Sequence, residues 1–322
     1  MSTTTATSSK PAPRTPAARP LVFIDGEAGT TGIEIRQKLA GTSAVDVRSI
    51  AVEARKDPAA RQEMMAAVDL VVLCLPDAAA REAVALADGL GDKTPRIIDA
   101  STAHRVAPGW VYGFAEMDRA QADAIRAAQR VTNPGCYPTG AIALIRPLVQ
   151  AGIMPADYPV TVNAVSGYSG GGKSMIEGYE AGTSPSFELY GLDMAHKHLP
   201  ELQRYTGLTR RPLFVPSVGN FRKGMLVSVP LHLDTLPGKP SVSDIEATLA
   251  AAYAGARLVT VKPATDKRIE AEALNDTDAM ELRVFGSDAH RHAVLVARLD
   301  NLGKGASGAA VQNIGLMLGV TL

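Results

Sequence analysis

Residues 21–32, LVFIDGEAGTTG, place four apolar residues directly before a glycine-rich turn. Leu21–Ile24 predicts a buried strand, and the apolar spacing from Ile33 to Leu39 predicts a helix. The turn reads G-x-x-G-x-x-G, a spacing that a plain strand-to-helix turn also produces. Glycines at such a place let backbone N–H groups close on a pyrophosphate at the helix N-terminus. The stretch therefore predicts the first unit of a nucleotide-binding sheet, with cofactor contacts from Gly26, Gly29, Thr30, Thr31 and Gly32.

Short apolar runs and helical stretches continue to alternate, which is typical of a parallel sheet covered by helices. In this part the expected strands are 45–52, 70–75 and 96–99, and the expected helices are 59–67 and 81–90. Later strands at 160–165, 225–233, 257–261 and 292–299 indicate a mixed sheet. The apolar helix 309–318 is expected to return to the first domain. We predict an α/β protein with a doubly wound (Rossmann) nucleotide domain, 20–137 and 302–322, and an α+β substrate and dimerisation domain, 138–301.

Composition narrows the classes of partner. The 322 residues include 33 Lys and Arg against 33 Asp and Glu, so no global field favours nucleic acid or an anionic membrane. No apolar run is long enough to span a bilayer. The two cysteines, Cys74 and Cys136, lie far apart in sequence, which predicts free thiols and a cytoplasmic location. Residues 1–19 are rich in Ser, Thr, Pro and Ala and carry no acid, which predicts a disordered tail, although an organellar transit peptide shares this bias.

The segment NPGCYPT, residues 133–139, places one cysteine in a rigid turn ahead of a helical pattern. Pro134 and Gly135 cannot continue a strand, so Cys136 is expected in the first turn of the following helix. There the helix dipole favours the thiolate and lowers the cysteine pKa. The alternative is a small apolar side chain in a turn.

Two further segments follow predicted strands, and the first of them leaves its strand at the same edge of the sheet as the glycine turn. Residues 99–105, DASTAHR, offer Arg105 for a phosphate or carboxylate and Ser101 for the cofactor, while His104 is interpreted as structural. Residues 166–173, SGYSGGGK, form a second glycine-rich turn, so Ser166 and Gly167 are also cofactor candidates. A flexible hairpin is the alternative for this turn.

The choice of dinucleotide depends on the end of the second strand, where an acid suits a ribose hydroxyl and an arginine a 2′-phosphate. Glu53 lies there, but Arg55 and Lys56 follow it. Two cations beside one acid favour NADP, with Arg55 as the contact. A solvated loop of mixed charge is the alternative.

Residues 196–201, HKHLPE, contain two histidines without the further ligands of a zinc site, so no metal is predicted. General acid or base service beside a cysteine fits better. After the glycines of 303–308, Asn313 lies on the terminal helix, where it is expected to reach the nicotinamide amide if that helix docks on the nucleotide domain.

Together, the glycine turn, DASTAHR, NPGCYPT, SGYSGGGK, HKHLPE and the terminal helix with its Gln-Asn pair resemble the N-acetyl-gamma-glutamyl-phosphate reductase family, in its shorter branch, over residues 20–322. The resemblance implies NADPH-dependent reduction of an acyl phosphate through a Cys136 thioester in arginine biosynthesis, with His196 as acid and base. It further implies that the substrate contacts are Arg105, Asn133, His198 and Glu201. It also implies a homo-oligomer, either a dimer or a tetramer.

Two other functions remain open from the sequence. Aspartate-semialdehyde dehydrogenase shares the fold and the cysteine-histidine chemistry, but its cysteine normally sits in a different local sequence. A regulatory nucleotide binder could use Cys136 as a redox switch without turnover. The chain has no nearby second cysteine to resolve a sulfenic acid, which disfavours this reading.

Overall fold

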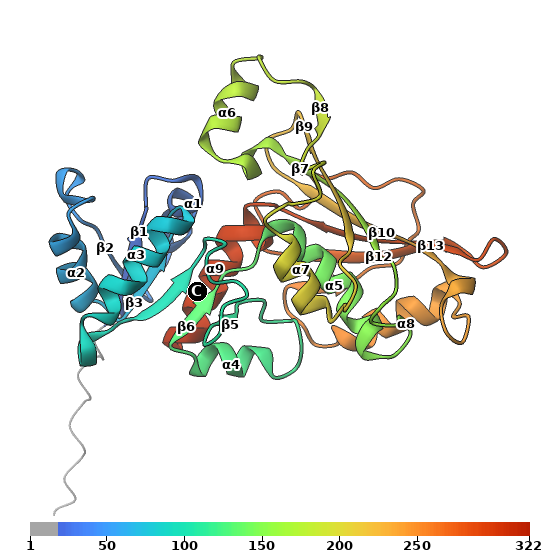
Figure 1. Ribbon diagram of the computed structural model, residues 1–322, viewed down its shortest axis with the longest axis horizontal. Coiled ribbons are helices and arrows are strands. Elements are labelled where there is room, and N and C mark those ends of the chain that lie inside the picture. Colours follow the sequence, from blue (N-terminus) through green and yellow to red (C-terminus); the bar gives the residue numbers. More distant parts are fainter. Residues whose placement is uncertain (1–18) are drawn as a thin grey trace, which may run out of the picture.

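The computed structural model describes residues 19–322, whose strands form two separate sheets (Figure 1). Residues 1–18, which make up nearly all of the predicted tail, lie outside the described residues. The prediction of disorder there stays a prediction.

The first sheet is parallel throughout, with strand order β2-β1-β3-β4-β6-β5. Its strands are β1 (Leu21–Asp25), β2 (Asp46–Arg48), β3 (Leu70–Leu73), β4 (Arg96–Asp99), β5 (Val111–Tyr112) and β6 (Arg130–Thr132). The helices that alternate with them are α1 (Thr30–Ala40), α2 (Pro58–Ala66), α3 (Asp77–Asp88) and α4 (Gln121–Ala127). The predicted doubly wound domain is confirmed, and its strands end at one edge, where a ligand can bind.

The second sheet is mixed, with strand order β11-β12-β13-β10-β7-β9-β8. Its strands are β7 (Thr161–Gly167), β8 (Phe187–Leu189), β9 (Leu213–Gly219), β10 (Met225–His232), β11 (Val259–Val261), β12 (Met280–Ser287) and β13 (His292–Leu299). The helices of this part are α5 (Cys136–Gln150), α6 (Lys173–Glu180), α7 (Leu199–Thr206) and α8 (Val242–Ala252). Beside the edge strand β8, helix α6 projects at the top of Figure 1.

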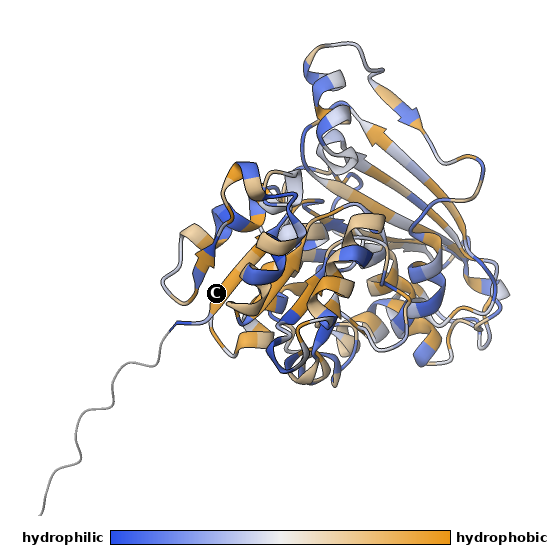
Figure 2. Cartoon of the chain, turned by 60° about the vertical axis from the view of Figure 1, so that its left-hand side comes forward, coloured by the Kyte–Doolittle hydropathy of each residue, from blue (hydrophilic) through white to orange (hydrophobic). Residues whose placement is uncertain are grey.

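The core lies where helices cover the sheets, and Figure 2 shows hydrophobic residues concentrated in the strands. Helix α5 packs against β10 and β13 and also contacts α7 and α8, and these elements contribute to the largest apolar cluster. The terminal helix α9 (Gly308–Leu318) packs through Ala310, Ile314 and Met317 against the first sheet. The chain therefore enters the second sheet at α5 and returns to the first after β13.

Some element boundaries differ from the prediction. The second strand, expected at 45–52, ends at Arg48, and Val52–Ala54 form a 3₁₀ turn. Five strands were not predicted, namely β5, β6, β8, β9 and β12, although β12 shows a clear alternation of buried and less buried residues. Residue alternation in β12 places Met280, Leu282 and Val284 in the core.

A buried ion pair fixes α2 to the glycine turn. Arg61 donates from Nε and Nη2 to Oδ2 of Asp25 at 3.0 and 2.7 Å, and both side chains are about nine-tenths buried or more. Burial raises the pKa of Asp25 even though Arg61 opposes this change. Removing the arginine would leave a buried carboxylate without its counter-charge.

We therefore expect Arg61→Met to lower the free energy of unfolding by about 3 kcal/mol near pH 7, measured by urea unfolding. The folded protein then binds a proton at Asp25 more tightly than the unfolded chain does, so the loss shrinks as the pH falls. Arg126→Met, which breaks the exposed pair with Asp123, is the control and should cost well under 1 kcal/mol. Equal effects of the two variants would contradict a special role for Arg61.

Candidate active site

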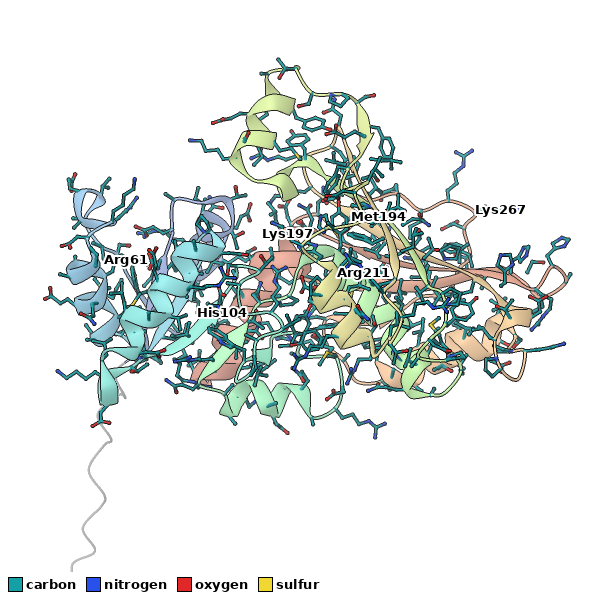
Figure 3. All side chains as sticks on the ribbon, in the orientation of Figure 1. Arg61, His104, Met194, Lys197, Arg211 and Lys267 are labelled. Atoms are coloured by element: carbon teal, nitrogen blue, oxygen red, sulfur yellow. The ribbon has the colours of Figure 1, made fainter. Side chains whose placement is uncertain are left out.

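A cavity of about 310 Å³ opens between the two sheet units and receives side chains from both. Thr30, Thr31 and Ala100 line it from the first unit. The second unit contributes Cys136, the glycine-rich turn after β7, and the segment of His196 to His198. Lys197 lies over the junction of the two units (Figure 3). Most of the predicted catalytic and substrate residues, and several of the predicted cofactor residues, thus line one cavity.

Cys136 begins helix α5, as predicted, because β6 ends at Thr132 and Gly135 is the extended residue before the helix. Cys136 lines the cavity, as does Gly305, which lies so close that a Cβ there would stand 3.0 Å from Cβ of Cys136. The cysteine is held between the helix start and the turn Gly303–Ser307, which precedes α9. Its position is therefore fixed by both units.

The expected low pKa of Cys136 is not found. Burial raises the pKa of the thiol above its ordinary value of 9.0, although Arg105 and the N–H of Tyr137 act in the opposite direction. Desolvation of the sulfur thus outweighs the helix dipole that the sequence suggested. The resting group is the thiol, and attack on a substrate requires transfer of its proton to a base.

Alkylation should report this protonation state. We expect the rate of iodoacetamide labelling at Cys136 to stay low below about pH 8 and to rise only at higher pH than for free cysteine measured in parallel. Labelled peptides identified by mass spectrometry separate Cys136 from Cys74, whose pKa burial raises to about 12. A labelling rate that is already maximal at pH 7 would show a resting thiolate.

Three polar groups converge behind the backbone of Gly135. A Cβ at this position would lie 2.6 Å from Oε1 of Glu201, 2.7 Å from Nη1 of Arg105 and 2.9 Å from Nε2 of His198. The residue before the cysteine must therefore be glycine, since any side chain would displace these groups.

Glu201 is the centre of this cluster and only 1% exposed. Its carboxylate accepts from Nη1 of Arg105 at 2.5 Å, from the hydroxyl of Tyr112 at 2.7 Å and from the N–H of Gly135 at 3.0 Å. The substrate contact expected of Glu201 stays a prediction. Glu201 does not line the cavity, and it positions Arg105 and the cysteine turn.

Arg105 and Asn133 line the cavity but are also tied to the protein. Arg105 donates from Nε to the Asn133 carbonyl at 3.1 Å, and three of its five N–H donors have protein acceptors. The amide of Asn133 donates to the Ala306 carbonyl at 2.9 Å. Arg105 keeps donors for an anion, whereas Asn133 mainly joins the cysteine turn to the turn before α9.

The two histidines lie at the cavity with different environments. The backbone N–H of His198 donates to Nδ1 of His196 at 3.2 Å, so the neutral His196 ring carries its proton on Nε2. Burial lowers the pKa of His196 to about 4, and the charge of Lys197 adds to this effect. Burial also lowers the pKa of His198 well below its ordinary value, and its Nδ1 is buried without a partner. Both rings are neutral at pH 7, and His196 can donate from Nε2 to a ligand oxygen.

Lys197 is a cavity residue that the sequence analysis missed. Its side chain is exposed and lines the cavity, and within residues 19–322 no carboxylate lies in ion-pair distance of it. The position of Lys197 between the two candidate histidines was the sequence feature that could have identified it. Lys197 gives the cavity a cation for an anionic substrate group.

The first unit supplies the features of a nucleotide site. Gly26 has φ of +92°, and a Cβ there would lie 2.3 Å from the Cys74 carbonyl oxygen, so only glycine fits this turn. Helix α1 starts at Thr30 with no side-chain cap from Gly29, and a second cavity that Gly29, Thr30 and Thr31 line adjoins the first. The open helix N-terminus fits a pyrophosphate.

Other predicted cofactor residues differ in placement. Ser166 and Gly167 line the main cavity, whereas Gly32 lies within α1 against Gly26. Arg55 lies outside both cavities and forms an ion pair with Glu27.

Two predicted cofactor residues line neither cavity, and their contacts with the cofactor stay predictions. The hydroxyl of Ser101 donates to Asp99 at 2.8 Å and does not line the cavity. Asn313 is fully buried, and its amide nitrogen donates to the Gly113 carbonyl at 2.9 Å. This bond joins α9 to the segment after β5, and the expected contact of Asn313 with the nicotinamide amide stays a prediction. His104, interpreted as structural, bonds Asp99 at 2.6 Å and stacks on Trp110.

The described residues contain neither a metal-binding cluster nor a membrane-spanning helix. Between residues 19 and 322, no group of three or more His, Cys, Asp or Glu side chains is arranged to hold a metal ion. In the same part of the chain, no helix is long and apolar enough to cross a membrane.

Comparison with known proteins agrees with this geometry. Residues 22–125 match the semialdehyde dehydrogenase NAD binding domain, and residues 136–301 match the semialdehyde dehydrogenase dimerisation domain. Across 305 residues the chain is 54% identical to N-acetyl-gamma-glutamyl-phosphate reductase of Chelativorans sp. (strain BNC1), covering 92% of this chain and 97% of the relative. The chain belongs to the N-acetyl-gamma-glutamyl-phosphate reductase family.

The same reductase from Sinorhizobium medicae (strain WSM419) is 53% identical over 309 residues, or 93% of this chain and 99% of the relative. The resemblance drawn from the motifs is confirmed, and the chain is an oxidoreductase with a nicotinamide cofactor.

Solved structures support the fold. Aspartate semialdehyde dehydrogenase II from Vibrio cholerae, complexed with ASA, matches with a TM-score of 0.72 over 95% of this chain and all of that chain. The enzyme with NADP from Candida albicans matches with a TM-score of 0.62 over 93% and 98%. At 14% and 12% identity these likenesses concern architecture, whereas the reductase family is shown by sequence.

Proposed function

We propose that the chain catalyses the NADPH-dependent reduction of N-acetylglutamyl 5-phosphate to N-acetylglutamate 5-semialdehyde and phosphate, a step of arginine biosynthesis. The observation that carries the proposal is Cys136 at a helix start, in one cavity with two neutral histidines and next to an open helix N-terminus. The names of the close relatives support the choice of substrate.

The chemistry begins at the sulfur of Cys136, which attacks the acyl carbon while His196, in the tautomer with a free Nε2, accepts the thiol proton and becomes an imidazolium. The bond to phosphate breaks, phosphate leaves, and a thioester remains on Cys136. Arg105 and Lys197 provide positive charge at the cavity for the phosphate and the substrate carboxylate. NADPH, when bound, supplies the hydride that reduces the thioester carbonyl.

His196 acts on the oxygen of the reduced intermediate. The imidazolium that took up the thiol proton gives a proton from Nε2 to the developing oxyanion and forms the hydroxyl of a thiohemiacetal on Cys136. Return of that proton to the ring expels the Cys136 sulfur and releases the semialdehyde. Arg105 favours the leaving thiolate, since it is the strongest influence that lowers the pKa of Cys136.

The direct test is the reverse reaction. N-acetylglutamate semialdehyde should reduce NADP only when phosphate is present, followed by absorbance of NADPH. Rapid oxidation of aspartate semialdehyde without turnover of the acetylated substrate would instead assign aspartate-semialdehyde dehydrogenase activity. No turnover with either aldehyde, together with intact cofactor binding, would favour a regulatory nucleotide binder.

We also propose a homo-oligomer, a dimer or a tetramer, because the matched second unit is described as a dimerisation domain. The free cysteines suit a reducing cytoplasm. In this proposal residues 20–137 and 302–322 form the dinucleotide-binding domain and residues 138–301 the substrate and dimerisation domain. Light scattering of the purified chain reports the oligomeric state.

A further inference from the structure

A buried lysine lies in the turn that contacts Cys136. The turn Gly303–Ser307 leads out of the second sheet into α9, which runs back along the first sheet (Figure 1). Lys304 in this turn is only 1% exposed. It does not line the main cavity, whereas its neighbours Gly305 and Ala306 do. Any effect of Lys304 on the reaction must therefore pass through these neighbours.

The ammonium group of Lys304 closes a ring of three side chains. Its Nζ donates to Oε2 of Glu116 at 2.6 Å and to Oε1 of Gln312 at 2.8 Å. Nε2 of Gln312 donates to the other oxygen of Glu116 at 2.8 Å. The same ammonium lies 5.5 Å from the centre of the Phe114 ring. Because Glu116 follows β5 and Gln312 lies on α9, one cation ties the turn to two segments of the nucleotide unit.

The turn has an unusual backbone and joins this ring to the cysteine. It is wound as a π turn, a rare form that is often found at functional sites. A Cβ at Gly305 would stand 3.0 Å from Cβ of Cys136, and the Ala306 carbonyl accepts from the amide of Asn133 at 2.9 Å. A shift of Lys304 therefore reaches the cysteine turn through two contacts.

We infer that Lys304 is a positioning residue for Cys136: its ion pair with Glu116 holds the turn in place, and the turn keeps the sulfur aligned and shielded from water. The inference rests on the proposed use of Cys136 as the nucleophile. Without the ion pair the turn is free to move, and solvent gains access to the thiol. Misplacing a reacting group by about 1 Å can lower a rate by about 100-fold, so the effect on turnover should be large.

Lys304→Met tests the inference through the rate of iodoacetamide labelling at about pH 8, which needs no substrate. We expect the rate at Cys136 to rise about fivefold, because solvation of the sulfur favours the thiolate, while the rate at Cys74 stays unchanged. Mass spectrometry of the labelled peptides separates the two cysteines. In the reductase assay kcat should fall about 10- to 100-fold, with KM for NADPH unchanged.

Arg146→Met is the matched control for this variant. It breaks a partly buried ion pair between α5 and Asp118, which lies in the same segment between β5 and α4 as Glu116. Because Arg146 does not contact the turn, labelling of Cys136 in this variant should match that of the unaltered chain.

A double variant, Lys304→Met with Glu116→Gln, separates positioning from stability. Lys304→Met alone leaves a buried carboxylate without its cation and lowers the free energy of unfolding, whereas the double variant buries no unpaired charge. Stability in urea should therefore largely recover in the double variant, but labelling of Cys136 should remain raised. The double variant also gives the answer if Lys304→Met does not fold.

Three outcomes would overturn the inference. Unchanged labelling of Cys136 in both variants would show that the turn keeps its place without the lysine. An equal rise at Cys74 and Cys136 would show general loosening of the fold. Recovery of labelling together with stability in the double variant would leave Lys304 only a stabilising role. A reductase assay that fails with the unaltered chain would remove the proposed reaction, while the labelling comparison would still decide the role of Lys304.

Discussion

Cys136→Ser removes reductase activity by at least about 10⁴-fold and leaves NADPH binding intact. The serine hydroxyl has nearly the same size and place at the start of α5, but it is a far weaker nucleophile than sulfur, and a hydroxyl gives up its proton far less readily than a thiol. Steady-state turnover and fluorescence titration with NADPH measure the two properties separately.

Mass spectrometry adds a direct view of the covalent step. With acyl phosphate and no cofactor, the unaltered chain should gain the mass of one N-acetylglutamyl group at Cys136, and the serine variant should gain none. Cys74→Ser is the control, because Cys74 follows β3 in the nucleotide unit, and this variant should still form the adduct. Turnover retained by Cys136→Ser would remove the cysteine from the mechanism.

His196→Asn should slow turnover by about 100-fold, the usual scale for loss of a general acid or base. The amide can still occupy the site, but it cannot shuttle a proton between the reduced intermediate and the departing sulfur. Rates of single-turnover hydride transfer measure the effect, and His290→Asn, at an exposed turn before β13, is the control.

The pH profile gives an independent readout for His196. Its lowered pKa of about 4 means that the ring stays neutral as the pH falls from 8 to 6. Loss of activity through protonation of this ring should therefore begin only below about pH 5, and the asparagine variant should lose this limb. A larger defect in His198→Asn than in His196→Asn would reverse the roles of the two residues.

The fold could be predicted for those segments whose own pattern of apolar and polar residues is sufficient to define a strand or a helix. The limits of β4 and β13 match the expected strands because continuous or alternating apolar residues end at polar ones. The start of α5 follows from Gly135 and the proline before it. Buried and less buried residues also alternate along β12, so its sequence pattern was sufficient to predict this strand as well.

The site was predictable in its chemistry and less so in its contacts. The motifs identified Cys136, His196 and Arg105, which the structure places at one cavity. They could not show that Glu201 binds Arg105 across 96 residues, since this pairing depends on how α7 packs on the cysteine turn. Nor could spacing reveal the burial that raises the pKa of Cys136 above its ordinary value.

The chain passes between the two sheet units at two points, from β6 into α5 and from β13 into the turn before α9. Gly305 in the second crossing touches Cys136 in the first, so both connections meet at the cysteine. Any hinge between the units must pivot through this point. We therefore expect that opening and closing would carry dinucleotide and acyl chain toward or away from the sulfur, while the sulfur itself stays nearly still.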